Sequence, residues 1–366
     1  MHRSQAIDIL RALAVFLVLG RHLDFNGCPA HGFFRDILNI WYGGGWTGVD
    51  LFFVLSGFLV SGLLFREHKK YGSISYKNFF LRRGLKIYPS FYFLLVITCG
   101  WTFFQTGRPG LSGLLAEGFF VQNYFGGSWE HTWSLGVEEH FYLLLPLLLI
   151  FLCHRNANHS DKFKSIPWIC FGLVAVCLTL RLIVSLQSPY DFGTHQARTH
   201  LRLDGLFFGV MLSYFYHYYP DFLARLQPFK YGLLVLGLVT ISPAFIFQIE
   251  STFFIYTFGL TLVYFGFGLI LLAALTEKKL EHPWFSGIAY IGSRSYSIYL
   301  WHWPLAIWSG ALVKYLFGGF GNWWLYASSY FSGAIIVGIV MSELMEYPVI
   351  RLRDRIFPSR SNPLTP

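Results

Sequence analysis

The stretch HRSQAIDILRALAVFLVLGRHLDF, residues 2–25, decides the fold. It is apolar over most of its length, and a run of about 20 such residues can cross a bilayer as a helix. It also carries four ionisable side chains, Asp8, Arg11, Arg21 and His22. Because an ionisable group that faces lipid near the helix centre costs about 2.5 kcal/mol or more, these side chains need a protein partner or a water-filled cavity.

Helical geometry places Arg11 and His22 on one face of this segment. Eleven steps of about 100° and 1.5 Å make about three turns, so the two side chains lie roughly 16 Å apart, with Asp8 on the same face. One interpretation is structural: Asp8 pairs with Arg11 at one membrane surface, and Arg21 and His22 reach the other. The alternative is a functional polar stripe that faces a cavity.

The composition predicts an all-α polytopic membrane protein. Only 13% of the 366 residues are charged and 20% are aromatic, with a mean hydropathy of +0.48. Soluble domains have a charged fraction of about 25%. Apolar segments run nearly end to end, so residues 1–366 are expected to form a single integral-membrane domain with a short basic tail at 351–366.

About ten membrane-spanning helices are expected. The first segment is followed by a glycine-rich loop at 26–46, and the later spans are separated by short connections. The predicted spans are 2–25, 48–65, 87–105, 133–153, 166–186, 201–219, 231–248, 252–275, 285–313 and 324–345.

The basic residues indicate how the chain crosses the membrane. The segment from Arg66 to Lys86 contains seven Lys and Arg residues, both ends included, which predicts that this connection is cytoplasmic. The basic tail is then cytoplasmic too, and so is the amino terminus. The net charge of +9 is therefore interpreted as a topology signal and not as a nucleic-acid footprint. The five cysteines form no CxxC motif, which indicates packing residues and no disulfide framework.

The segment FLRRGLKIYP contains Arg82, Arg83 and Lys86 directly before an apolar helix, with Tyr88 beside them. One interpretation is a topology signal that also contacts anionic membrane lipids. The other is a site for the phosphates of an acyl or nucleotide donor that enters from the cytosol. Walker and dinucleotide-binding glycine patterns are absent from the sequence.

The segment HTWSLGVEEHFYLLLP places Glu138 and Glu139 in the first turns of a predicted span. Carboxylates suit the positive end of a helix dipole, but two exceed what capping requires. A carboxylate here could instead orient an imidazole or bind a sugar hydroxyl. No HExxH motif is present and His131 and His140 are nine residues apart, so no metal site is expected.

Further polar side chains interrupt the apolar spans. Arg202 and Asp204 either neutralise each other or line an external polar cavity. The others are Asp50, Ser56 and His302, and Trp133 adds an aromatic face of the kind on which sugar rings stack.

Seven segments, in order, carry a resemblance to a known family: DILRALAVFLVLGRH, GVDLFFVLSGFLVS, FLRRGLKIYP, TWSLGVEEHFYLLLP, RLDGLFFG, SYSIYLWHWPL and ELMEYPVIR. The chain resembles the acyltransferase-3 family of integral-membrane acyltransferases, many of which O-acetylate surface polysaccharides. The family pattern of a basic residue, ten intervening positions and a histidine falls on Arg11 and His22. Its arginine-rich motif falls on Arg82 and Arg83, with Lys86 where a third arginine is common.

The resemblance implies acyl transfer from acetyl-CoA, or another short acyl-CoA, to a hydroxyl of a cell-surface or lipid-linked carbohydrate in the bacterial inner membrane. It implies His22 as general base, Arg11 as donor-positioning or charge-stabilising group, and Glu138 as the group that orients the acceptor or His22. A covalent acetyl-histidine is the alternative mechanism. The implied donor-binding residues are Arg82, Arg83, Lys86 and Tyr88. The implied substrate-binding residues are Asp50, Ser56, Trp133, Glu139, Arg202, Asp204 and His302.

Two other functions fit the same residues. A carrier or flippase for a lipid-linked glycan would line its path with similar charges. A non-catalytic membrane partner of polysaccharide assembly proteins is the third possibility.

Overall fold

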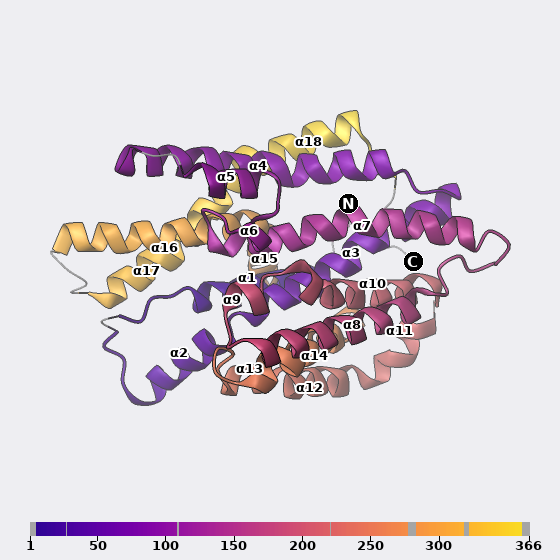
Figure 1. Ribbon diagram of the computed structural model, residues 1–366, viewed down its shortest axis with the longest axis horizontal. Helices are drawn as coiled ribbons and strands as arrows, with labels where there is room; N and C mark the ends of the chain where they lie inside the picture. The colour runs from indigo at the N-terminus through magenta and orange to yellow at the C-terminus, as the bar shows by residue number, and fades with distance from the viewer. Residues whose placement is uncertain are drawn as a thin grey trace.

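A computed structural model describes residues 5–26, 28–107, 110–219, 221–276, 283–317 and 322–360. The described residues form helices and no strands, which confirms the all-α prediction. The long helices run roughly parallel along the longest axis of the molecule (Figure 1). They are α1 (Gln5–Arg21), α3 (Thr47–Tyr71), α4 (Tyr76–Thr106), α7 (Trp133–Arg155), α8 (Ile166–Gln187), α10 (Leu203–Tyr218), α12 (Lys230–Ile241), α14 (Leu260–Leu275), α16 (Ser295–Phe317) and α17 (Trp323–Met341).

Short helices connect or extend these. They are α2 (Gly32–Gly44), α5 (Leu111–Gly118), α6 (Gln122–Phe125), α9 (Phe192–His195), α11 (Asp221–Leu226), α13 (Pro243–Ile246), α15 (Pro283–Ser293) and α18 (Tyr347–Ile356), with single turns η1 (Glu130–Thr132), η2 (Thr199–Leu201), η3 (Gln227–Phe229), η4 (Ile255–Gly259) and η5 (Ser342–Glu346).

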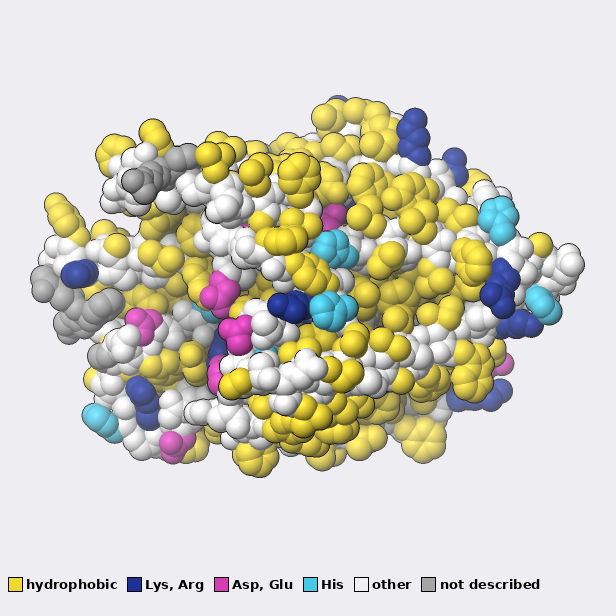
Figure 2. Space-filling model, viewed as in Figure 1, with side chains coloured by type: hydrophobic (Ala, Val, Ile, Leu, Met, Phe, Trp, Pro, Cys, Tyr) yellow, Lys and Arg dark blue, Asp and Glu magenta, His cyan; other side chains and the backbone are white. Residues whose placement is uncertain are grey.

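Seven helical segments in the described part of the chain are long and apolar enough to cross a membrane. They include α3, α4, α7, α8 and α14, and two that extend over α11 to α13 and α17 to α18. The predicted number of about ten is reached only if α1, α10 and α16 cross as well. The molecule is therefore a polytopic helical membrane protein, with apolar side chains over the face shown in Figure 2.

Two predicted segments were wrong. The expected loop at 26–46 contains α2, whose apolar residues recur at helical spacing and whose Trp41 indole donates to the Phe16 carbonyl at 3.1 Å. The expected span at 285–313 is two helices that meet at Arg294. The basic tail begins as helix α18, and residues 361–366 of that tail lie outside the described part.

Helices α3 and α10 form the centre of the bundle, and glycines let them approach closely. A Cβ atom at Gly57 would lie 1.9 Å from the Leu206 carbonyl oxygen, and one at Gly209 would lie 2.3 Å from the Val54 carbonyl oxygen. Side chains at these positions would force the helices apart. The close contact fixes where α3 and α10 place their polar side chains.

Candidate active site

Two cavities lie between α1, α3, α7 and α16. The larger has a volume of about 460 Å³ and the smaller about 80 Å³. Val49 of α3 and Tyr299 of α16 line both, so these two side chains form part of the wall between them. Tyr299 is fixed there, because its hydroxyl donates to the His131 carbonyl at 2.6 Å and accepts from the Ser134 hydroxyl at 2.7 Å.

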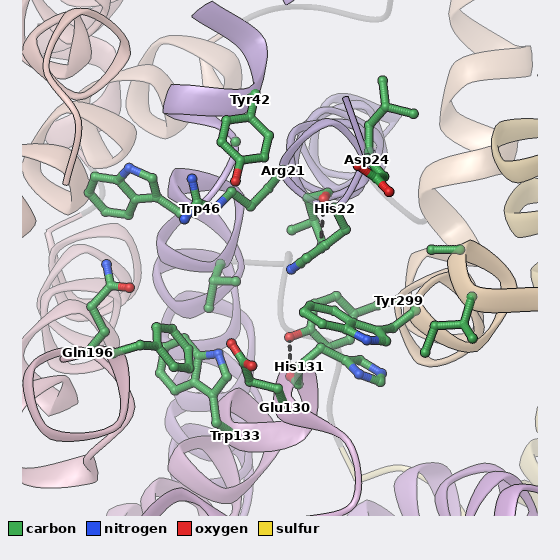
Figure 3. Close-up of a pocket in the computed structure, with 18 of the residues that line it drawn as sticks. Arg21, His22, Asp24, Tyr42, Trp46, Glu130, His131, Trp133, Gln196 and Tyr299 are labelled. Carbon is green, nitrogen blue, oxygen red and sulfur yellow. Dashed lines mark hydrogen bonds between the residues drawn. The ribbon is translucent and has the colours of Figure 1, made fainter. Parts of the chain in front are cut away.

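The larger cavity combines charged and aromatic side chains (Figure 3). His22 enters it from the end of α1, and on the opposite wall Glu130 and His131 enter from the turn η1 and Trp133 from the start of α7. Its other lining residues include Arg21, Asp24, Tyr42, Trp46, Gln196, Arg202, Trp303 and Tyr326. Such a mixture suits a carbohydrate, because sugar rings stack on aromatic faces while their hydroxyls bind charged and amide groups.

The smaller cavity collects most of the predicted cations. Arg11, Arg83 and Lys86 line it together with Ser56 and Glu138. The Arg83 guanidinium lies 4.0 Å from the centre of the Tyr142 ring and donates to the Tyr142 hydroxyl, which in turn donates to Glu138 at 2.6 Å. Three cations and a carboxylate at the border of a small cavity are suited to hold an anionic ligand and a short uncharged group beside it.

The order of residues along each helix places the two cavities one after the other along the bundle. On α1, Arg11 of the smaller cavity is eleven residues before His22 of the larger. On α7 the order is reversed, with Trp133 of the larger cavity before Glu138 of the smaller. Since the predicted topology runs α1 outward and α7 inward, the larger cavity is expected at the external side and the smaller at the cytoplasmic side.

Several predicted site residues lie behind the cavity walls. Arg82 donates to the Asp354 carboxylate of α18 at 2.9 Å, and the Tyr88 hydroxyl donates to Glu139 at 3.0 Å. His302 is 0% exposed and contacts His22. These four predicted residues, Arg82, Tyr88, Glu139 and His302, are not among the described residues that line either cavity.

Of the two interpretations of Arg202 and Asp204, mutual neutralisation is not what the structure shows, and Arg202 lines the larger cavity. The Arg202 guanidinium donates to Asp50 of α3 at 2.6 Å, whereas Asp204 accepts from Arg181 of α8. All four side chains are buried, and a buried charge needs such a partner. Arg202 also lies over two aromatic rings, 5.4 Å from the Trp133 ring centre and 5.6 Å from that of Phe53, and it lines the larger cavity.

His131 is one of the residues of the larger cavity that the sequence did not identify as site residues. Its backbone is held by a loop anchored on Glu117 of α5, which is 0% exposed and accepts from the Trp129 amide at 2.9 Å and the Thr132 hydroxyl at 3.1 Å. Burial raises the pKa of the Glu117 carboxyl. Three histidines from different parts of the chain meet here. The ring centre of His302 lies 4.9 Å from that of His22 and 5.0 Å from that of His131. The described residues contain no group of three or more side chains arranged to hold a metal ion.

Known proteins resemble this chain over most of its length. A family model described as an acyltransferase domain matches residues 4–343. "O-acetyltransferase OatA" of Staphylococcus aureus is 30% identical over 332 residues, which are 82% of this chain and 50% of that protein. "Peptidoglycan O-acetyltransferase OatA" of Listeria monocytogenes is 30% identical over 334 residues, 82% of this chain and 49% of that protein. The chain spans about half the length of these relatives, and no solved structure matches it.

Proposed function

The chain belongs to the acyltransferase-3 family, and from this premise we propose that it is a membrane-bound O-acyltransferase. It moves an acetyl or other short acyl group from acetyl-CoA to a hydroxyl of a cell-surface or lipid-linked carbohydrate. The observation that carries the proposal is His22, an imidazole in the wall of a 460 Å³ cavity whose other walls suit a sugar. The names of the relatives, one a peptidoglycan O-acetyltransferase, support this acceptor class.

Each of the two cavities takes one of the two substrates. The acceptor occupies the larger cavity, and the donor enters through the smaller one, where Arg83 and Lys86 meet its phosphates and Arg11 lies beside the arm that carries the thioester toward His22. The phosphates stay at the Arg83 and Lys86 end of the smaller cavity, because its volume of about 80 Å³ leaves no room for the nucleotide and admits only the narrow arm that carries the acyl group. The acyl group therefore passes the wall formed by Val49 and Tyr299 to meet the acceptor.

His22 acts as general base in this scheme. The acceptor oxygen bonds to the acyl carbonyl carbon as its proton moves to His22 Nε2, and the C–S bond then breaks. The thiolate leaves and takes that proton to become the free thiol of CoA. An oriented base contributes about 10² to 10⁴ in rate.

The test uses the purified chain in detergent with acetyl-CoA and muramidase-released peptidoglycan fragments. We expect thiol release that depends on the glycan, and an acetyl group on the fragments by mass spectrometry. A carrier or flippase has no reason to release thiol. Intact acetyl-CoA with every glycan fragment tried, from protein that still binds CoA, would contradict acyl transfer to this acceptor class.

A further inference from the structure

His302 is in contact with the proposed base. Its Nε2 lies 3.0 Å from His22 Nδ1, and its side chain is 0% exposed. We propose that His302 is a positioning residue that holds His22 in the tautomer whose Nε2 lone pair faces the larger cavity. The inference rests on the proposed role of His22 as base.

The tautomer of His302 follows from its second contact. Its Nδ1 lies 2.5 Å from the Tyr299 carbonyl oxygen, which can only accept a hydrogen bond. Nδ1 of His302 therefore carries the proton. In a neutral imidazole the other nitrogen, Nε2, is then an acceptor, and it is this atom that faces His22.

The same reasoning fixes His22. Its Nδ1 lies 3.0 Å from the Val18 carbonyl oxygen and 3.0 Å from His302 Nε2, and both are acceptors. Two acceptors at one nitrogen place the proton on that nitrogen and leave the lone pair on His22 Nε2. A base needs that lone pair to receive the proton of the acceptor hydroxyl.

The sequence WHWP builds this arrangement through Pro304. Proline has no N–H, so the carbonyl of Leu300, four residues earlier, lacks its helical donor. His131 Nε2 donates to that carbonyl at 3.1 Å. The His131 ring thereby lies edge-on to His302, with ring centres 5.0 Å apart, and stacks over Trp303 at 5.8 Å. His302 is packed in one orientation as a result.

The arrangement also serves the protonated state. When His22 has taken the acceptor proton it is an imidazolium, and its Nδ1–H still has the Val18 carbonyl and His302 Nε2 as acceptors. Hydrogen bonds from a charged donor are about twice as strong as neutral ones. Loss of the lone pair on His302 Nε2 therefore weakens the hydrogen bond that orients the His22 ring, both when His22 is neutral and when it is protonated.

Two conservative variants separate the two nitrogens of His302. His302→Asn keeps an amide near the position of Nδ1 and removes the acceptor that faces His22. His302→Gln places an amide oxygen near the position of Nε2. We expect His302→Asn to lower kcat by about tenfold or more while the acceptor KM stays within about twofold, and His302→Gln to recover most of kcat.

Nitrogen-15 NMR of histidine-labelled protein supplies a readout that a merely structural role would not change. The His22 signals, assigned by their loss in His22→Ala, should report a protonated Nδ1 in the parent and in His302→Gln. In His302→Asn they should report a mixture of tautomers. The control is His200→Asn, which removes an imidazole bound to Tyr124 outside both cavities and should leave rate and signals unchanged.

Equal losses of kcat in folded His302→Asn and His302→Gln, or an unchanged His22 tautomer in both, overturn the inference. Failure of the proposed function looks different, because His22→Ala would then retain transfer, or the parent would show none.

Discussion

Arg82 and Arg83 are consecutive in the sequence, yet their guanidinium groups contact different helices. Arg82 donates to Asp354 and to the Phe357 carbonyl, both at the carboxyl-terminal end of α18. Arg83 turns into the bundle, where it lies over the Tyr142 ring and lines the smaller cavity. The two residues that the family motif treats alike therefore have different surroundings.

Arg83→Ala should weaken CoA binding more than Arg82→Ala. A hydrogen bond to a charged group contributes about 1.5–3 kcal/mol, so the loss at Arg83 should raise the Kd for CoA by about tenfold or more. Arg82→Ala should instead weaken the contact of α18 with α4, which faster proteolysis near Arg355 would show. The Kd for CoA should change by less than about threefold. Calorimetric titration with CoA in detergent measures both. Equal effects on Kd would assign both arginines to the donor.

The sequence predicted the helical class and most helix positions because long apolar runs between basic connections leave few alternatives. It also predicted that Arg11 and His22 share a face, although the structure places them at different cavities. What it could not predict were contacts between helices. The pairing of Arg202 with Asp50 joins residues 152 positions apart, and no local spacing reports it.

The contact that His131 makes with another helix could not be predicted from the sequence either, although the sequence contains one indication of it. Pro304 inside a predicted span indicates a free carbonyl at Leu300, which needs a donor from another element. The sequence does not say that the donor is His131, because the loop that carries it is positioned by the buried Glu117.

The predicted topology can be tested with single cysteines in a cysteine-free background. A membrane-impermeant maleimide added to intact cells should not modify Lys70→Cys, because the basic connection between α3 and α4 is expected in the cytoplasm. It should modify Phe33→Cys, since Phe33 is 80% exposed on α2, at the expected external side. Labelling of position 70 but not position 33 would reverse the orientation of the whole bundle.

Gly57→Ala should destabilise the protein. The added Cβ would meet the Leu206 carbonyl oxygen at 1.9 Å, and overpacking of this kind typically costs about 1–3 kcal/mol. Thermal unfolding in detergent, followed by intrinsic fluorescence, should show a lower Tm. Gly172→Ala is the matched control, because that helical glycine of α8 has no heavy atom within 4 Å of its added Cβ. A lower Tm in the control alone would contradict the close packing of α3 on α10.

Asp50→Ala should be more destabilising than the double variant Asp50→Leu with Arg202→Met. The single change leaves the Arg202 charge buried without its partner, which costs about 3–5 kcal/mol. The double change replaces the ion pair by apolar groups, and such replacements are often neutral. The measurement is again Tm in detergent, compared among parent, single and double variants. A single variant as stable as the parent would mean that this pair contributes nothing to the fold.

His22→Ala should lower the transfer rate by about 10² or more, because an oriented base contributes about 10² to 10⁴. CoA binding should be unchanged, since the proposed phosphate ligands Arg83 and Lys86 line the other cavity. Rate and Kd must be measured on the same purified protein, because a carrier that uses His22 in a proton path also loses function on mutation.

The control is His31→Ala, which should match the parent. His31 is exposed and precedes α2, and its side chain makes no capping hydrogen bond. A His22→Ala protein that transfers at near the parent rate would remove His22 from the mechanism. Glu138, which borders the smaller cavity beside Arg83, would then be the next candidate for the base.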